Sequence, residues 1–123
     1  MKLEVGQFAR LKSGYICKII NINDFREPNM KYGVEASYLK DIMFIGDDDI
    51  LKASHNIIDI LEVGDYVNGN KVIEIEKNYK FIDGTIRDIL WTDTKMQKAI
   101  WDETIKSIVT KEQFEQMAYK VGE

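Results

Sequence analysis

The sequence predicts a mainly β protein built from two small β units in tandem, and three observations support this fold class. First, 45% of the 123 residues are hydrophobic, 31% are charged and only one is proline, a composition that excludes disorder and a collagen-like chain. Second, an internal repeat recurs at an offset of 58 residues. Third, short strand-like segments are bounded by turn dipeptides throughout the chain.

The repeat begins with the same turn-like motif in both copies. Residues 3–8 have the sequence LEVGQF, and residues 61–66 have the sequence LEVGDY. A glycine followed by a polar residue and an aromatic residue predicts a sharp bend that enters an edge strand. Each copy continues through a turn dipeptide, Ser13-Gly14 or Asn68-Gly69, into a strand-like segment. We therefore expect a β-hairpin at the start of each half.

The two halves also end alike, with a short strand, a helix-start signal and a closing strand. In the first half these are Asp41–Ile45, Asp47–Asp49 before Ile50-Leu51, and Asn56–Ile60; in the second they are Thr104–Val109, Thr110–Gln113 before Phe114, and Ala118–Val121. Three consecutive carboxylates suit the positive end of a helix dipole, and the Thr110–Gln113 segment has a capping-box pattern. Both helices are expected to have one or two turns.

A hairpin, further strands, a short helical turn and a closing strand, within about 60 residues, is the order of elements in an SH3-like small barrel. The predicted fold is therefore two tandem SH3-like small barrels, at 1–61 and 62–123, either separate or packed as a single domain. A short helix is expected from Thr94 to Trp101. The alternative architecture is a single fused sheet with one helix.

The charge balance argues against generic binding to nucleic acid. The chain carries 17 basic and 21 acidic side chains, a net charge of −4, whereas binding to a phosphate backbone requires excess positive charge. The acid is concentrated in residues 41–66, which carry seven acidic side chains and one basic one. The start of the chain has no signal-peptide pattern and no apolar run reaches the length of a membrane span, so a cytoplasmic protein is expected.

No pattern in the sequence indicates catalysis. The chain has one histidine, His55, and one cysteine, Cys17, which lies in an apolar run and is interpreted as a small buried thiol. Neither residue belongs to a recognisable zinc site or to a nucleophile–base pair, and no phosphate-binding glycine motif is present. We expect a protein that is not an enzyme and that needs no metal or cofactor.

Two groups of residues are candidates for binding. The first group is acidic and consists of Asp47, Asp48, Asp49 and Asp65. These carboxylates either cap a helix and form a solvated face or form a patch that binds a basic partner, and metal binding is the weakest interpretation. Exposed aromatic side chains could join them: Trp101 at the end of an apolar stripe, and Phe25 and Tyr32 in the loop at 23–33. Trp91 is expected to pack in the core.

An alternative candidate is a basic face on the first hairpin. There Arg10, Lys12 and Lys18 alternate with apolar residues, a pattern found in small barrels that bind nucleic acid, although a solvated strand face is the favoured interpretation. These three side chains could also bind an anionic nucleotide. Open sheet edges in small barrels additionally allow a homodimer.

Two segments resemble parts of small accessory proteins encoded by phages and prophages of Gram-positive bacteria. Residues 105–121 are similar to the closing segment of that group, and residues 56–69 are similar to its strand-to-hairpin segment. The resemblance implies an anti-defence protein that binds a host defence protein, such as a CRISPR effector, and inhibits it. The alternatives are a protein that sequesters a nucleotide signal and a small-barrel nucleic-acid-binding protein, whose affinity would fall steeply with salt.

Overall fold

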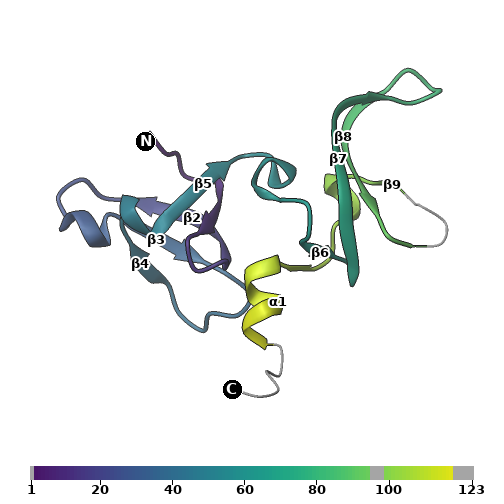
Figure 1. Ribbon diagram of the computed structural model, residues 1–123. Coiled ribbons are helices and arrows are strands. Elements are labelled where there is room, and N and C mark those ends of the chain that lie inside the picture. Colours follow the sequence, from purple (N-terminus) through teal and green to yellow (C-terminus); the bar gives the residue numbers. More distant parts are fainter. Residues whose placement is uncertain (1, 95–98, 118–123) are drawn as a thin grey trace, which may run out of the picture. The chain divides into compact units, whose positions relative to one another are not determined.

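The computed structural model describes residues 2–94 and 99–117 and shows a mainly β protein (Figure 1). The chain divides into two compact units, Met1–Ile60 and Leu61–Glu123, hereafter unit 1 and unit 2. The sequence-based division lies after residue 61, one residue away. Each unit contains one antiparallel five-stranded sheet, so the mainly β fold class is confirmed.

Unit 1 contains five strands and three short 3-10 helices. The strands are β1 (Phe8–Leu11), β2 (Ile16–Ile22), β3 (Tyr32–Glu35), β4 (Met43–Ile45) and β5 (Ile50–Ser54), and the 3-10 helices are η1 (Pro28–Met30), η2 (Asp47–Asp49) and η3 (Ile57–Ile60). The order in the sheet is β4-β3-β2-β1-β5. The first strand therefore lies between the second and the fifth.

Unit 2 repeats this arrangement and adds an α-helix. Its strands are β6 (Tyr66–Val67), β7 (Asn70–Lys80), β8 (Ile86–Thr92), β9 (Ala99–Ile100) and β10 (Ile108–Val109), with the 3-10 helix η4 (Asp102–Thr104) and the helix α1 (Lys111–Met117). The order in the sheet is β10-β6-β7-β8-β9. In both units a 3-10 helix joins the fourth strand to the fifth. Within the described residues, neither sheet is closed into a barrel by pairing of its edge strands.

The sequence repeat corresponds to a repeated turn. Gly6 has a φ of +95° and Gly64 a φ of +101°, which L side chains rarely adopt, so glycine is required at both positions. The amide of Gly6 donates to the carbonyl of Ile19 in β2 (2.7 Å), and that of Gly64 donates to the carbonyl of Val72 in β7 (2.9 Å). The same motif thus fixes the entry into the first strand of each sheet.

The predicted hairpins are confirmed. β1 pairs with β2 after a turn in which Gly14 has a φ of +95°, and β6 pairs with β7 after Asn68 and Gly69, whose φ values are +51° and +83°. Two successive positive φ angles define a type I′ turn, the geometry that an Asn-Gly pair favours.

Two predicted elements of the first half, a short helix and a closing strand, differ in length or type. The signal at Asp47–Asp49 gives only the three-residue η2, after which Ile50–Ser54 forms the fifth strand by pairing with β1. The strand expected at Asn56–Ile60 is wrong, because Ile57–Ile60 is the 3-10 helix η3, which buries Ile58 and Ile60.

In the second half, the strand expected at 104–109 is limited to β10 at Ile108–Val109. The helix signal at Thr110 is confirmed by α1: the Gln113 amide donates to Thr110 Oγ1 (3.2 Å), and the Thr110 amide donates to Gln113 Oε1 (3.0 Å). The helix expected at 94–101 is wrong where it can be tested, since Ala99–Ile100 is the strand β9. The remaining residues of that segment, 95–98, and the strand expected at 118–121 lie outside the described residues.

Each unit has its own buried apolar residues. Eight of those of unit 1 form one cluster, and Ile58 and Ile60 of η3 are buried as well; the cluster consists of Ala9, Leu11, Cys17, Ile19, Tyr32, Val34, Ile45 and Ile50. Those of unit 2 are Leu61, Val67, Val72, Ile89, Leu90 and Ile100. The interpretation of Cys17 as a buried thiol is confirmed, and burial raises its pKa to about 11.

Candidate functional site

The most distinctive surface feature of unit 2 is a chain of four half-buried aromatic rings, Tyr79, Phe81, Trp91 and Trp101, hereafter the aromatic surface. Tyr79 contacts Trp91 edge-on with ring centroids 6.1 Å apart, and it contacts Phe81 in the same manner at 5.1 Å. Phe81 in turn contacts Trp101 at 5.9 Å. Because each ring keeps part of its surface in solvent, the four rings form one contiguous, partly exposed apolar area.

A β-bulge in β7 brings Tyr79 to this surface. Lys77 and Asn78 together stand opposite the single residue Asp88 of β8, and Asn78 has a φ of +58°. Asp88 stabilises the bulge by accepting hydrogen bonds from the Asn78 amide (2.9 Å) and from Lys77 Nζ (2.6 Å). Since side chains alternate along a strand, the extra residue places Tyr79 on the same face as Glu76 rather than on the opposite face.

The other two strands complete the same face. Trp91 of β8 is paired with Ala99 of β9, and Trp101 follows Ala99 by two residues, so alternation places both tryptophans on one side of the sheet. Ile89 lies two residues before Trp91, on this face, and is fully buried. The β7–β8 hairpin that carries most of the aromatic surface is the long ribbon of unit 2 in Figure 1.

Trp91 lies beside two carboxylates of the neighbouring strand. Its indole Nε1–H donates to Glu76 Oε1 at 3.2 Å, and Glu74 is its cross-strand partner in β7. A second bulge, at Ile73, places Glu74 on this face although Val72 faces the core. Glu74 is exposed to solvent.

Trp101 lies beside a cation and a third carboxylate. The guanidinium of Arg87 lies over the Trp101 ring, 5.6 Å from its centroid, and is 3.5 Å from Glu103 Oε1. Among the described residues, three carboxylates and one guanidinium therefore surround the rings, which gives this part of the aromatic surface a negative balance.

The tip of the hairpin next to the aromatic surface is also apolar. Ile82 is fully exposed and Ile86 is 62% exposed. The turn between them contains Gly84 at a φ of +87°, and Asp83 accepts hydrogen bonds from both the amide and the hydroxyl of Thr85. These hydrogen bonds lower the pKa of the Asp83 carboxyl.

The structure gives two of the three consecutive aspartates structural roles. Asp49 accepts a hydrogen bond from the Gly46 amide at the start of η2 (3.0 Å), which agrees with the capping interpretation. Asp47 accepts a hydrogen bond from the Tyr32 hydroxyl (2.6 Å). Tyr32 is only 1% exposed, which removes it from the exposed aromatic candidates, and burial is the main reason that its pKa is raised. Asp48 remains a solvent-exposed carboxylate.

The loop that carries Phe25 is held by specific contacts. Asn23 accepts a hydrogen bond from the Phe25 amide through its side chain (2.9 Å) and donates its own amide to the carbonyl of Lys31 (2.9 Å). The guanidinium of Arg26 lies over the Phe44 ring at 3.9 Å. Phe25 itself is 100% exposed, so the loop presents one aromatic ring wholly to solvent.

Asp65 lies inside unit 2, contrary to its expected place on an acidic surface. It is 0% exposed, and its carboxylate accepts hydrogen bonds from the amides of Glu62 (2.7 Å) and Lys111 (2.9 Å). Asp65 therefore joins the repeated turn to the first residue of α1.

The structure does not support the basic face expected on the first hairpin. Arg10 is 0% exposed, and its Nη1 donates to the carbonyl of Ile60 in η3 (3.2 Å). The misassigned segment explains this error, because η3 packs against β1 and β5. Lys12 and Lys18 are exposed, and Lys18 Nζ lies 5.8 Å from the centroid of the Phe8 ring.

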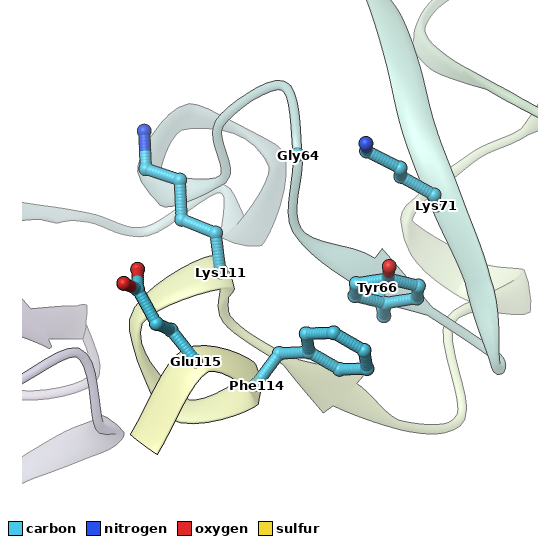
Figure 2. Close-up of a pocket in the computed structure, with 6 residues that line it drawn as sticks. All are labelled: Gly64, Tyr66, Lys71, Lys111, Phe114 and Glu115. Atoms are coloured by element: carbon cyan, nitrogen blue, oxygen red, sulfur yellow. The ribbon is translucent and has the colours of Figure 1, made fainter. Parts of the chain in front are cut away.

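Unit 2 also contains a shallow hollow of about 340 Å³ beside α1, shown in Figure 2. Tyr66 of β6 and Phe114 of α1 stack at 4.5 Å with an interplanar angle of 21° and form its aromatic wall. Lys71 projects from β7 on the side of Tyr66, and Lys111 projects from α1 and pairs with Glu62 at 2.6 Å. The remaining lining residues are Gly64 and Glu115.

Metal-binding clusters and membrane-spanning helices are both absent from residues 2–94 and 99–117. In this part of the chain no three His, Cys, Asp or Glu side chains are grouped closely enough to hold a metal ion. No helix among the same residues has the length and hydrophobicity needed to cross a membrane. Comparison of the chain with protein-family models, curated proteins and solved structures gave no match.

Proposed function

We propose that the protein is a non-catalytic binding protein that recognises a partner protein through the aromatic surface. The observation that carries this proposal is the contiguous chain of four partly exposed rings. Tryptophan and tyrosine contribute a disproportionate share of binding energy at protein interfaces, and a contiguous exposed apolar area is itself typical of an interaction site. The exposed Ile82 at the hairpin tip extends this area.

The fold proposal is that each unit is an SH3-like small barrel. Two features support it: the first strand lies between the second and the fifth in both sheets, and a 3-10 helix joins the fourth strand to the fifth. Small β folds of this type often bind partners through aromatic side chains on strands and loops.

The partner proposed is a host defence nuclease such as a CRISPR effector, met in the bacterial cytoplasm and inhibited by binding. The resemblance of residues 56–69 and 105–121 to phage accessory proteins motivates this choice. The negative balance of the aromatic surface adds a physical reason, because nucleases carry basic surfaces that bind nucleic acid.

A retention experiment tests both the surface and the partner. Tagged wild-type protein and the variants Phe81→Ser and Phe25→Ser are incubated with host lysate, and the retained proteins are identified. Phe25→Ser serves as the matched control and also tests Phe25, the candidate named from the sequence, against the aromatic surface, since it removes a wholly exposed ring of the same chemistry from unit 1. We expect the wild type and the control to retain a defence nuclease, which Phe81→Ser loses. Equal retention by Phe81→Ser would reject the surface, and retention of no defence protein would reject the partner.

The hollow beside α1 favours a second candidate function, binding of a small planar anion such as a nucleotide. The aromatic wall formed by Tyr66 and Phe114 offers ring surface, and Lys71 supplies a positive charge next to it. A ligand that binds only the folded state raises the melting temperature. A shift with nucleotides that Phe114→Ala abolishes would support this function, and the absence of any shift across a nucleotide panel would reject it.

A further inference from the structure

The aromatic surface contains the same pairing of an indole ring with carboxylates twice. At Trp101 the arrangement is complete: the Arg87 guanidinium lies 5.6 Å from the ring centroid, and Glu103 is 3.5 Å from that guanidinium. The ring face and the carboxylate both attract the cation, so this arrangement stabilises a guanidinium at the surface of the sheet.

At Trp91 the ring and the carboxylates are present, and among residues 2–94 and 99–117 no cation lies over this ring. Glu76 accepts the indole N–H at 3.2 Å, and the exposed Glu74 stands directly across the strand pair. In the part of the chain that the structure describes, the cations that lie over rings belong to other sites: Lys18 over Phe8, Arg26 over Phe44, Lys31 over Tyr32 and Arg87 over Trp101.

We propose that Trp91, Glu74 and Glu76 bind an arginine side chain of the partner protein, with its guanidinium over the indole ring and its N–H groups directed at the two carboxylates. This inference rests on the proposed function, because it names the chemistry that the aromatic surface recognises. The partner residue completes at Trp91 the arrangement that Arg87 completes at Trp101.

The geometry favours arginine over lysine and over nucleic acid. A guanidinium is planar, stacks on an indole and carries several N–H donors, so it can contact the ring and two carboxylates at once, whereas the ammonium of lysine is a compact point charge. The two glutamates repel phosphate groups, which excludes nucleic acid as the favoured ligand. The expected ligand is therefore an arginine-bearing segment of a protein.

The test follows the indole N–H signals by NMR during titration with short capped peptides. The chain contains two tryptophans, so two indole signals are expected, and the Trp101→Phe variant assigns them. The probes are a peptide of alternating arginine and glycine, the same peptide with lysine, and a single-stranded oligonucleotide. We expect the Trp91 signal to shift with the arginine peptide, with an affinity at least about fivefold higher than for the lysine peptide.

Charge-matched variants isolate the two carboxylates. The double variant Glu74→Gln/Glu76→Gln is expected to weaken binding of the arginine peptide at least about tenfold. The control Glu27→Gln/Glu35→Gln changes the net charge equally at two exposed residues of unit 1 and should bind like the wild type. Equal binding of the two peptides, a preference for the oligonucleotide, or no effect of the Glu74/Glu76 variant would overturn the inference.

Comparison with the retention experiment separates the two proposals. If Phe81→Ser loses the partner while Glu74→Gln/Glu76→Gln retains it fully, the aromatic surface binds the partner but the arginine assignment is wrong. If both variants retain the partner, the proposed function itself is wrong. If both lose it and the control does not, both proposals are supported.

Discussion

Replacement of Asp65 by asparagine is expected to destabilise unit 2 strongly, although the substitution changes only one functional group. The buried carboxylate of Asp65 accepts one backbone hydrogen bond on each oxygen, from Glu62 and from Lys111. Asparagine keeps one acceptor and presents an NH₂ group to the other amide. A hydrogen bond to a charged group contributes about 1.5 to 3 kcal/mol, and an unsatisfied buried donor adds to the cost. We expect a loss of about 3 kcal/mol in the free energy of unfolding.

Urea unfolding followed by tryptophan fluorescence measures this loss selectively. Both tryptophans, Trp91 and Trp101, lie in unit 2, so their emission reports the unfolding of that unit. For a unit of this size the dependence on urea is about 1 kcal/mol per M, so the midpoint should fall by about 3 M or the unit should be unfolded without urea.

The repeated turn of unit 1 supplies the control. Gln7 occupies the position equivalent to Asp65, and its half-buried side chain accepts one hydrogen bond from the Glu4 amide (2.9 Å). Gln7→Ala should cost less than about 1 kcal/mol and leave the fluorescence midpoint unchanged. A midpoint shift below about 0.5 M for Asp65→Asn would refute the conclusion that its carboxylate joins the turn to α1.

Three further predictions concern backbone geometry and burial. Gly46→Ala should destabilise unit 1 by about 1 to 3 kcal/mol in thermal unfolding followed by circular dichroism, because a Cβ atom there would lie 2.4 Å from the Pro28 carbonyl oxygen; an unchanged melting temperature would contradict this packing. Asn78→Val should lower the free energy of unfolding by about 1 to 2 kcal/mol and shift the NMR signal of the Trp91 indole N–H. Asn78→Gly should do neither, because glycine adopts a φ of +58° freely. The native Cys17 thiol should resist thiol reagents at pH 8 and react in denaturant. Burial raises its folded pKa from 9.0 to about 11, so the unfolded state loses its proton first and stability relative to Cys17→Ala should fall as the pH rises from 9 to 11.

Local signals in the sequence identified several elements correctly. The glycines of the repeat require a positive φ, Asn68-Gly69 specifies a type I′ turn, and Thr110 with Gln113 caps the helix that follows. Each of these signals depends on contacts within a few residues. These signals can be recognised in the sequence because such local conformational preferences exist without the rest of the fold.

Long-range pairing decided the elements that were predicted wrongly. Ile50–Ser54 is a strand because it pairs with β1, about 40 residues earlier in the chain. Ile57–Ile60 contains enough apolar residues for a strand, yet that sheet edge is already occupied by β5. The covering of Arg10 by η3 follows from the same arrangement, so the basic face could not be excluded from sequence.

The aromatic surface was also beyond sequence reasoning, although Trp101, one of its four rings, was among the candidates named from the sequence. Its composition depends on the pairing of β7 with β8 and on the extra residue at the bulge, which decide the face that Tyr79 occupies. The one local signal was Asn78, a residue that tolerates a positive φ, immediately before two aromatic residues separated by one position.

The bulge at 77–78 also has an evolutionary consequence. Deleting one residue there restores plain alternation, so Tyr79 would exchange faces with Lys80 while the pairing of β7 with β8 nearer the core could stay as it is. A single-codon insertion or deletion can thus exchange the side chains that the hairpin presents to solvent without altering the buried residues. Among relatives of this chain, a difference in the length of the β7–β8 hairpin should therefore indicate a change in the composition of the aromatic surface more reliably than any substitution in the core.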